Sequence, residues 1–198
     1  NARFARVDSD TIDNLIAKSE KIKPQLSETE QEDLSVIFQS VLPKENQYYV
    51  QAENLGEDAA PILITQSEFM RRYREMSAMG GGMNFYGEMP DMYNVVLNSD
   101  HKLIKQVLND TDSACSEELL PIETSLATLN FEQSQIQKKQ EGKKYDEITQ
   151  AERDELSAVE KKIADEKSKK DAVLGKYAGG NKVIRQLVDL ALLQNNML

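Results

Sequence analysis

The chain of 198 residues has a single cysteine, and Cys115 cannot form a disulfide within the chain. A reducing, cytoplasmic setting fits a protein without disulfides. No apolar run reaches the roughly eighteen residues that a membrane-spanning helix requires, so we expect neither a membrane segment nor a secretory signal. Lysine and arginine number 24 against 34 aspartate and glutamate residues, and the net charge of −10 disfavours an extended groove for nucleic acid.

Groupings of residues that support catalysis or metal binding are also missing. The single histidine, His101, is not paired with a cysteine, a serine or a second histidine, so we expect a structural or solvent-facing role. The glycine run 80–82 lacks the Gly-Lys-Ser/Thr that completes a phosphate-binding loop. No set of aspartate, glutamate and histidine has metal-ligand spacing. We therefore expect no catalytic site, no metal and no cofactor in this chain.

Residues 44–110 predict, in order, a strand, a strand, a helix that begins at Ser67, a loop, a strand and a helix, which together form a small α+β domain. Residues 48–52, 62–65 and 92–97 are rich in β-branched and aromatic residues, and the first two should pair directly or through a neighbour. Ser27 and Glu30 form a capping box before an amphipathic helix that Pro43 ends. The apolar positions of this helix are Leu34, Ile37, Phe38, Val41 and Leu42. Polar residues 98–100 are expected to cap a further helix.

Residues 116–178 differ in character from the segments before them. Apolar residues recur at helical steps on both sides of Gly142, and Thr149 with Glu152 forms a second capping box. The apolar positions are Leu119, Ile122, Leu126, Leu129 and Ile136, then Leu156, Val159, Ile163 and Val173. The remaining faces are rich in glutamate, lysine and aspartate, which predicts a solvated surface. This pattern predicts a long antiparallel helical hairpin.

Six of the seven methionines lie between Met70 and Met92, interleaved with phenylalanine and tyrosine and with the glycine run 80–82. Methionine is unbranched and polarisable, so such a cluster suits a surface that accepts varied apolar partners. Alternatively, the methionines of a helix in this segment fill gaps in a core. The glycine-rich part cannot be regular core, which favours a mobile, adhesive flap.

The last predicted helix begins after Asn181, which is a suitable N-cap, and covers residues 182–198. Its apolar residues occupy nearly the whole circumference, so the helix is expected to be buried on all sides. Because the polar body of the chain offers little cover, we expect a subunit interface, and a two-fold contact between identical copies is the common solution. The residues predicted for dimerisation are Val183, Ile184, Leu187, Val188, Leu190, Ala191, Leu192 and Leu193.

Several strings resemble the C-terminal domain of the heat-shock protein 90 chaperones of the bacterial high-temperature protein G type. Residues 95–101, VVLNSDH, match the family's strand-to-helix string, with Ser99 in place of the usual proline. Residues 188–193, VDLALL, are similar to its dimerisation helix, and residues 3–20 to the end of its middle domain. Two features depart from the family: an inserted hairpin at 112–180, and the lack of the last helix of its four-helix dimer contact.

The resemblance implies a cytoplasmic, homodimeric, ATP-dependent chaperone that assists protein folding in the stress response. ATP and Mg²⁺ would bind in an N-terminal domain that this chain does not include. Implied client contacts are Phe69, Met70, Tyr73, Met76, Met79, Met83, Phe85 and Tyr86. The expected parts are 1–43, the end of the middle domain with connecting helices; 44–111 with 181–198, the dimerisation domain; and 112–180, the hairpin. The alternative hypothesis is a structural coiled-coil adaptor that works through the hairpin.

Overall fold

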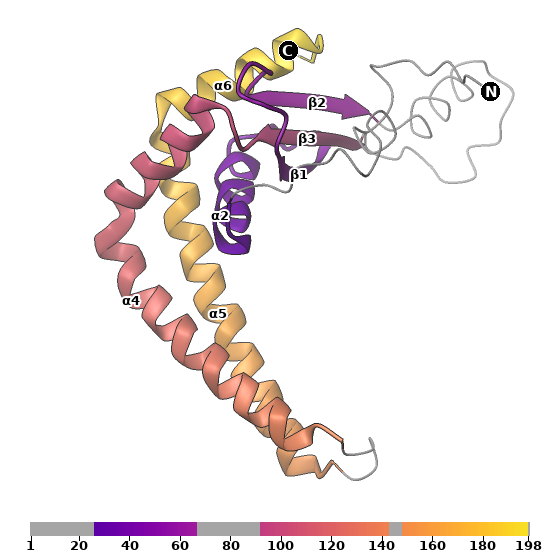
Figure 1. The fold of residues 1–198 in the computed structure, drawn as a ribbon, viewed down its shortest axis with the longest axis vertical. Helices are drawn as coiled ribbons and strands as arrows, with labels where there is room; N and C mark the ends of the chain where they lie inside the picture. The colour runs from indigo at the N-terminus through magenta and orange to yellow at the C-terminus, as the bar shows by residue number, and fades with distance from the viewer. Residues whose placement is uncertain (1–25, 67–91, 143–147, 198) are drawn as a thin grey trace, which may run out of the picture. The chain divides into compact units, whose positions relative to one another are not determined.

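The computed structural model describes residues 26–66, 92–142 and 148–197 (Figure 1). In chain order the elements are α2 (Glu28–Gln39), β1 (Gln47–Glu53), β2 (Ile62–Gln66), β3 (Met92–Asn98), α4 (Lys102–Gln140), α5 (Gln150–Gly180) and α6 (Lys182–Gln194). The predicted α+β class, with a three-stranded sheet, a long helical hairpin and a C-terminal helix, is confirmed. The chain divides into two compact units, one of residues 1–110 with 178–198 and one of residues 111–177.

Helix α2 begins at the predicted capping box. The backbone N–H of Ser27 donates to Glu30 Oε2 at 2.7 Å, and the N–H of Glu30 donates to Ser27 Oγ at 3.3 Å. These hydrogen bonds favour the ionised carboxylate, so the pKa of Glu30 lies below its ordinary value. The helix ends at Gln39, earlier than the predicted stop at Pro43, because Ser40 already caps it. Leu42 lies beyond the helix but remains buried.

The sheet has the order β1-β3-β2, with β3 parallel to β1 and antiparallel to β2. The first two strands therefore pair through a neighbour, which was one of the two predicted arrangements. Val95 at the centre lies between Val50 and Ile64 in the register. The rings of Tyr48 and Tyr93 stack across β1 and β3 with centroids 5.7 Å apart.

Two helices cover this sheet. Helix α2 packs on β1, and α6 packs on β2 (Figure 1). Helix α2 contributes Leu34, Ile37 and Phe38, which are fully buried. Removing such side chains from water stabilises the unit by roughly 1.5–3 kcal/mol each. The sheet and the two helices packed on it form the core of this unit.

Helix α4 is continuous from Lys102 to Gln140. The helix predicted after Asp100 and the first helix of the predicted hairpin are therefore one helix. Pro121 lies inside it and has no N–H to donate to the carbonyl of Glu117. Because Pro121 is exposed, water can reach that carbonyl and the helix continues.

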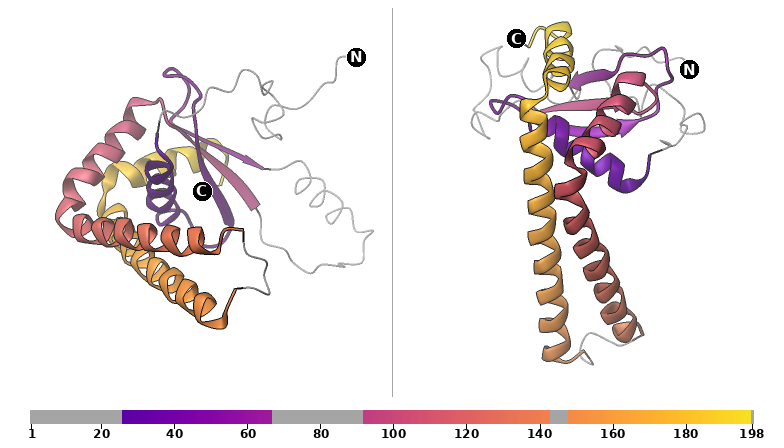
Figure 2. Two further views of the ribbon diagram at one scale, coloured as in Figure 1. Left: turned by 60° about the horizontal axis from the view of Figure 1, so that its bottom comes forward. Right: turned by 90° about the vertical axis from the view of Figure 1, so that its left-hand side faces the viewer.

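The unit of residues 111–177 is an antiparallel pair of helices, as predicted (Figure 2). Contacts between the helices join Lys170 to Glu123, Glu160 to Gln133 and the carbonyl of Glu152 to Gln140, at 3.3, 3.4 and 3.1 Å. From the first of these contacts to the third, the residue number falls along α5 and rises along α4. The two helices are therefore antiparallel. The most buried apolar residues of the unit are Cys115, Leu119, Ile136, Val159 and Leu174. Burial, with the nearby acidic side chains of Glu118 and Asp112, raises the pKa of the Cys115 thiol.

Candidate interaction surfaces

Large apolar side chains are exposed in three regions of the described chain. Two project from the sheet, three from α4 and three from α6. These residues are Tyr49, Met92, Leu103, Leu120, Phe131, Val183, Leu190 and Leu193. Exposed apolar side chains that gather on one element mark contact surfaces more often than scattered ones do.

All eight residues implied as client contacts, Phe69 to Tyr86, lie outside the described residues. The positions where their segment leaves and rejoins the fold are described. Gln66, at the end of β2, pairs with Tyr93, near the start of β3. Residues 67–91 therefore connect two adjacent antiparallel strands, and both ends of the segment are fixed at paired positions of one sheet.

Two exposed residues lie on the sheet close to that connection. Side chains alternate between the two faces of a strand, so the register places Tyr49, opposite Asn94, on the same face as Met92. Both side chains are exposed. This end of the sheet thus presents an aromatic ring and a thioether beside the positions where residues 67–91 join it.

Helix α6 has two apolar faces. Its N-terminus is capped as predicted, with Asn181 Oδ1 accepting hydrogen bonds from the N–H groups of Val183 and Ile184 at 2.9 and 3.3 Å. The face turned into the chain consists of Ile184, Leu187, Val188, Ala191 and Leu192, all buried. The other face consists of Val183, Leu190 and Leu193, which are between 42% and 59% exposed. We call these three residues the α6 exposed face.

The eight residues predicted for dimerisation are thereby divided. Five are already covered within one chain, where α6 packs on β2. Only the α6 exposed face is available to another molecule. The sequence could not separate the two sets, because periodicity shows that a helix is apolar all round but not which side meets its own sheet.

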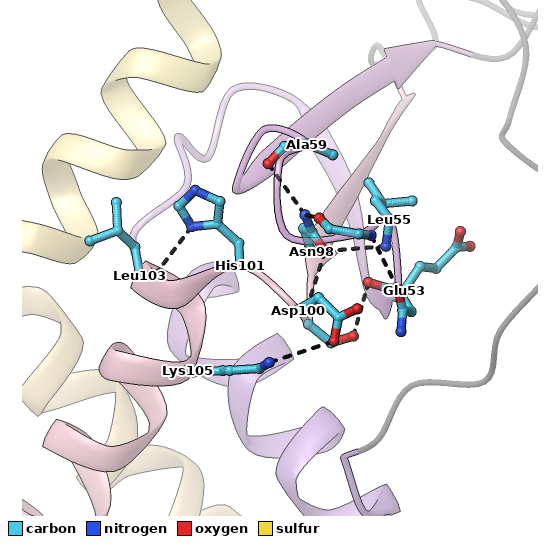
Figure 3. Close-up of polar contacts among 11 residues, drawn as sticks. Glu53, Leu55, Ala59, Asn98, Asp100, His101, Leu103 and Lys105 are labelled. Carbon is cyan, nitrogen blue, oxygen red and sulfur yellow. Dashed lines mark hydrogen bonds and ion pairs between the residues drawn. The ribbon is translucent and has the colours of Figure 1, made fainter.

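The string 95–101, on which the family resemblance partly rests, forms the junction between β3 and α4 (Figure 3). Asn98 is fully buried there. Its Oδ1 accepts from the N–H groups of Leu55 and Asp100, both at 3.2 Å. Its Nδ2 donates to the carbonyls of Gly56 at 2.8 Å and Ala59 at 3.4 Å. One amide therefore holds the loop between β1 and β2 against the end of β3, a role with no local sequence signal.

Ser99 supports the same junction. Its N–H and its hydroxyl both donate to the carbonyl of Glu53, at 2.8 and 3.1 Å. The usual proline of the family string has no N–H and no hydroxyl, so it could make neither bond. The serine at this position thus ties the end of β1 to the end of β3.

His101, rather than residues 98–100, provides the cap of α4. Its Nδ1 accepts a hydrogen bond from the N–H of Leu103 at 3.1 Å (Figure 3). Asp100 lies 3.6 Å from the ammonium of Lys105. The structural role expected for the histidine is confirmed, and the expected capping residue is corrected.

No group of three or more His, Cys, Asp and Glu side chains in the described part of the chain could hold a metal ion. No helix within residues 26–66, 92–142 and 148–197 is long and apolar enough to cross a membrane. The described residues define an α+β protein that exposes apolar side chains on helices and at one end of its sheet. Such surfaces suit contact with other polypeptides.

The chain is similar to chaperones of several bacteria. Chaperone protein HtpG of Bacteroides fragilis is 52% identical over 199 residues, covering 100% of this chain and 29% of the relative. HtpG of Bacteroides thetaiotaomicron is 50% identical with the same coverage. HtpG of Porphyromonas gingivalis is 43% identical, covering 98% of this chain and 29% of the relative. No family model and no solved structure matches the chain.

These identities extend over essentially the whole chain, and the chain belongs to the heat-shock protein 90 family, in its HtpG group. The family resemblance seen in the sequence is confirmed. The chain spans 29% of the length of the relatives it matches. This share is consistent with the C-terminal portion that the resemblance indicates.

Proposed function

We propose that this chain is the C-terminal dimerisation and client-contact module of a cytoplasmic, ATP-dependent chaperone that assists protein folding. The observation that carries the proposal is the α6 exposed face. A helix that is already anchored on β2 presents a second apolar side, and the chain belongs to a family of chaperones. Exposure of this kind is retained when another polypeptide covers it.

A second copy of the chain is the proposed partner of α6. Val183, Leu190 and Leu193 recur at steps of seven and three, the spacing with which two helices pack along a seam. A two-fold contact would place the same three residues of both copies against each other. Each square ångström of apolar surface that this contact removes from water contributes about 25 cal/mol to the hydrophobic part of its free energy.

Unfolded or partly folded client proteins are the proposed partners of Phe69, Met70, Tyr73, Met76, Met79, Met83, Phe85 and Tyr86. Support comes from the sheet, since paired Gln66 and Tyr93 fix the ends of their segment. Exposed Tyr49 and Met92 add apolar surface at the same end. Methionine can repack against many shapes, which suits clients without a common sequence.

ATP and Mg²⁺ are proposed to act through the N-terminal domain of the parent chaperone. The described residues of this chain offer no group that could hold a metal ion. The role proposed for the residues of this chain is binding.

The client proposal is tested by light scattering of a chemically unfolded protein diluted into buffer with the chain. The triple variant Met76→Ser, Met79→Ser, Met83→Ser should suppress aggregation less than the unchanged chain, with the same circular dichroism. The matched control is Leu103→Ser, which alters an exposed apolar residue elsewhere. This variant should suppress aggregation as well as the unchanged chain does. Undiminished suppression by the triple variant would count against client contact there.

The adaptor hypothesis is distinguished by replacing residues 112–177 with a short Gly/Ser linker. An adaptor that works through the hairpin would lose its function entirely. The chaperone proposal expects suppression of aggregation to survive at least in part.

A further inference from the structure

Each helix of the hairpin contains one residue that disfavours a helix. Within residues 111–140 of α4 the only proline is Pro121, and there is no glycine. Within residues 150–177 of α5 the only glycine is Gly175, and there is no proline. Proline and glycine have the lowest helix propensities of all residues. Their positions therefore mark where the two helices of the hairpin bend or open with the least cost.

The register of the hairpin brings these two positions to nearly the same level. The ammonium of Lys170 on α5 lies 3.3 Å from the carboxylate of Glu123 on α4. Because the helices are antiparallel, five residues beyond Lys170 on α5 corresponds to five residues before Glu123 on α4. Gly175 therefore lies at the level of Glu118, within the turn of residues 117–121 that ends at the proline. The weak points of the two helices coincide.

Two hydrogen-bonding features loosen the backbone of α4 at this level. Pro121 has no N–H to donate to the carbonyl of Glu117. Both residues are exposed, so water can reach that carbonyl and stabilise a bent form of the helix. The hydroxyl of Thr124 donates to the carbonyl of Leu120 at 2.8 Å, and a threonine bonded in this way often bends a helix. One turn of α4 is therefore less firmly held than its neighbours.

Packing against α4 does not explain the glycine of α5. Successive residues of a helix are turned by about 100°, so Gly175 lies about 140° around the helix from Lys170. Lys170 pairs with α4, and a side chain at position 175 would therefore not enter the seam between the helices. Gly142, in contrast, has a φ of +84°, which favours glycine at that position. Within the hairpin, the effect of Gly175 is to weaken α5 at this level.

The contacts between the helices differ in kind on either side of this level. Leu119 and Leu174, each four residues from the pair of Lys170 with Glu123, are buried. Apolar burial is non-directional, so it tolerates a change of angle. The three polar contacts between the helices described above lie on the side of the turn, within residues 123–140 and 150–170. These directional contacts hold the two segments together as one body.

We propose that the hairpin has a hinge at the level of Pro121 and Gly175. Residues 123–140 with 150–170, which we call the tip portion, bend there as one body. Since polar contacts join the two helices of the tip portion, one helix cannot change its angle without the other, and both backbones open together. The tip portion is about 26 Å long, so a bend of about 20° displaces its far end by about 9 Å. The hinge lies within the unit of residues 111–177 and uses neither the methionine-rich segment nor α6.

The test is amide hydrogen exchange of the full chain, resolved by mass spectrometry of its fragments. In the unchanged chain, residues 117–124 and 172–177 should exchange faster than the turns on either side, because a hinge opens locally. Pro121→Ala alters only α4 and should slow exchange at least about fivefold in both segments. Gly175→Ala alters only α5 and should also slow exchange in both. The decisive effect is the one on the other helix, since a substitution that only strengthens its own helix slows exchange there alone.

Matched controls raise helix propensity away from the hinge. Asn130→Ala in α4 and Ser168→Ala in α5 alter exposed positions and replace residues of lower helix propensity with alanine, as the two test variants do. Both controls should leave exchange at residues 117–124 and 172–177 unchanged.

Two outcomes would overturn the proposal. One is a slowing of exchange that is confined to the substituted helix, because Pro121 and Gly175 would then weaken their own helices independently. The other is exchange at the level of these residues that is as slow in the unchanged chain as in the neighbouring turns. Pro121→Ala and Gly175→Ala test the coupling separately, so either variant that folds decides the matter.

Discussion

The ammonium of Lys170 on α5 lies 3.3 Å from the carboxylate of Glu123 on α4, and the lysine side chain is only 7% exposed. A buried ammonium must be compensated by charge and hydrogen bonds, while its carboxylate partner here remains half exposed. A pair of this kind in the seam between two helices defines their register more than it adds to stability.

We expect Glu123→Gln to lower the free energy of unfolding by about 1 kcal/mol, because solvent at Glu123 limits the strength of the pair. Lys170→Met, which keeps length and removes the charge, should change stability less or raise it. Urea unfolding followed by circular dichroism measures both. A larger loss for Lys170→Met than for Glu123→Gln would show that the lysine stabilises the hairpin mainly through its other contacts.

His101 provides the N-terminal cap of α4 through Nδ1. Replacing it with alanine should lower the free energy of unfolding by about 1 kcal/mol, since an uncapped N–H is then left at the helix start. His101→Asn retains an acceptor and should recover most of that loss. Thermal unfolding of the two variants makes the comparison. Equal losses in both would show that the imidazole acts by packing.

The capping box of α2 predicts a dependence on pH. Hydrogen bonds from Ser27 lower the pKa of Glu30 in the folded chain. A carboxyl group with a lowered folded pKa stabilises the fold above its unfolded pKa, about 4.3 for glutamate, and this contribution is lost as the pH falls through the folded pKa. Ser27→Ala should raise the pKa of Glu30, measured by NMR titration, and should cost about 1 kcal/mol at neutral pH. An unchanged pKa of Glu30 in the Ser27→Ala variant would contradict this cause of the shift.

The two faces of α6 predict opposite consequences of the same substitution. Leu190→Asp with Leu193→Asp alters only exposed positions, so sedimentation velocity should show a monomer with unchanged circular dichroism. Leu187→Asp places a charge at a buried position and should lower the free energy of unfolding by several kcal/mol. If the unchanged chain sediments as a monomer at high concentration, this chain does not dimerise by itself.

Signals that act within a few residues could be predicted from the sequence. The capping boxes at Ser27 and Thr149 and the cap at Asn181 are found at the predicted positions. Each depends on a pattern of only three or four consecutive residues. The antiparallel hairpin also follows from its repeat alone. In each case the physical cause lies within one turn of the helix or within its period.

Features that depend on distant partners could not be predicted. The contacts of Asn98 reach back more than forty residues, and no pattern around Asn98 indicates them. The continuity of α4 was missed for another reason. Thr111 and Cys115 are buried and continue the line of Ile104 and Leu119, but a hydroxyl and a thiol do not stand out as apolar periodicity. For α6, the division into two faces depended on where β2 lies.

The strand order has a consequence for how the chain is made. Among the described strands, β1 and β2 each pair with β3 and not with each other, so a nascent chain that emerges from the ribosome holds β1 and β2 before their common partner. These two strands can form their sheet hydrogen bonds with β3 once residues 92–98 have been synthesised, and β3 then lies between β1 and β2. A chain that stalls before Asn98 would carry two open strand edges, the type of surface on which misfolded chains aggregate.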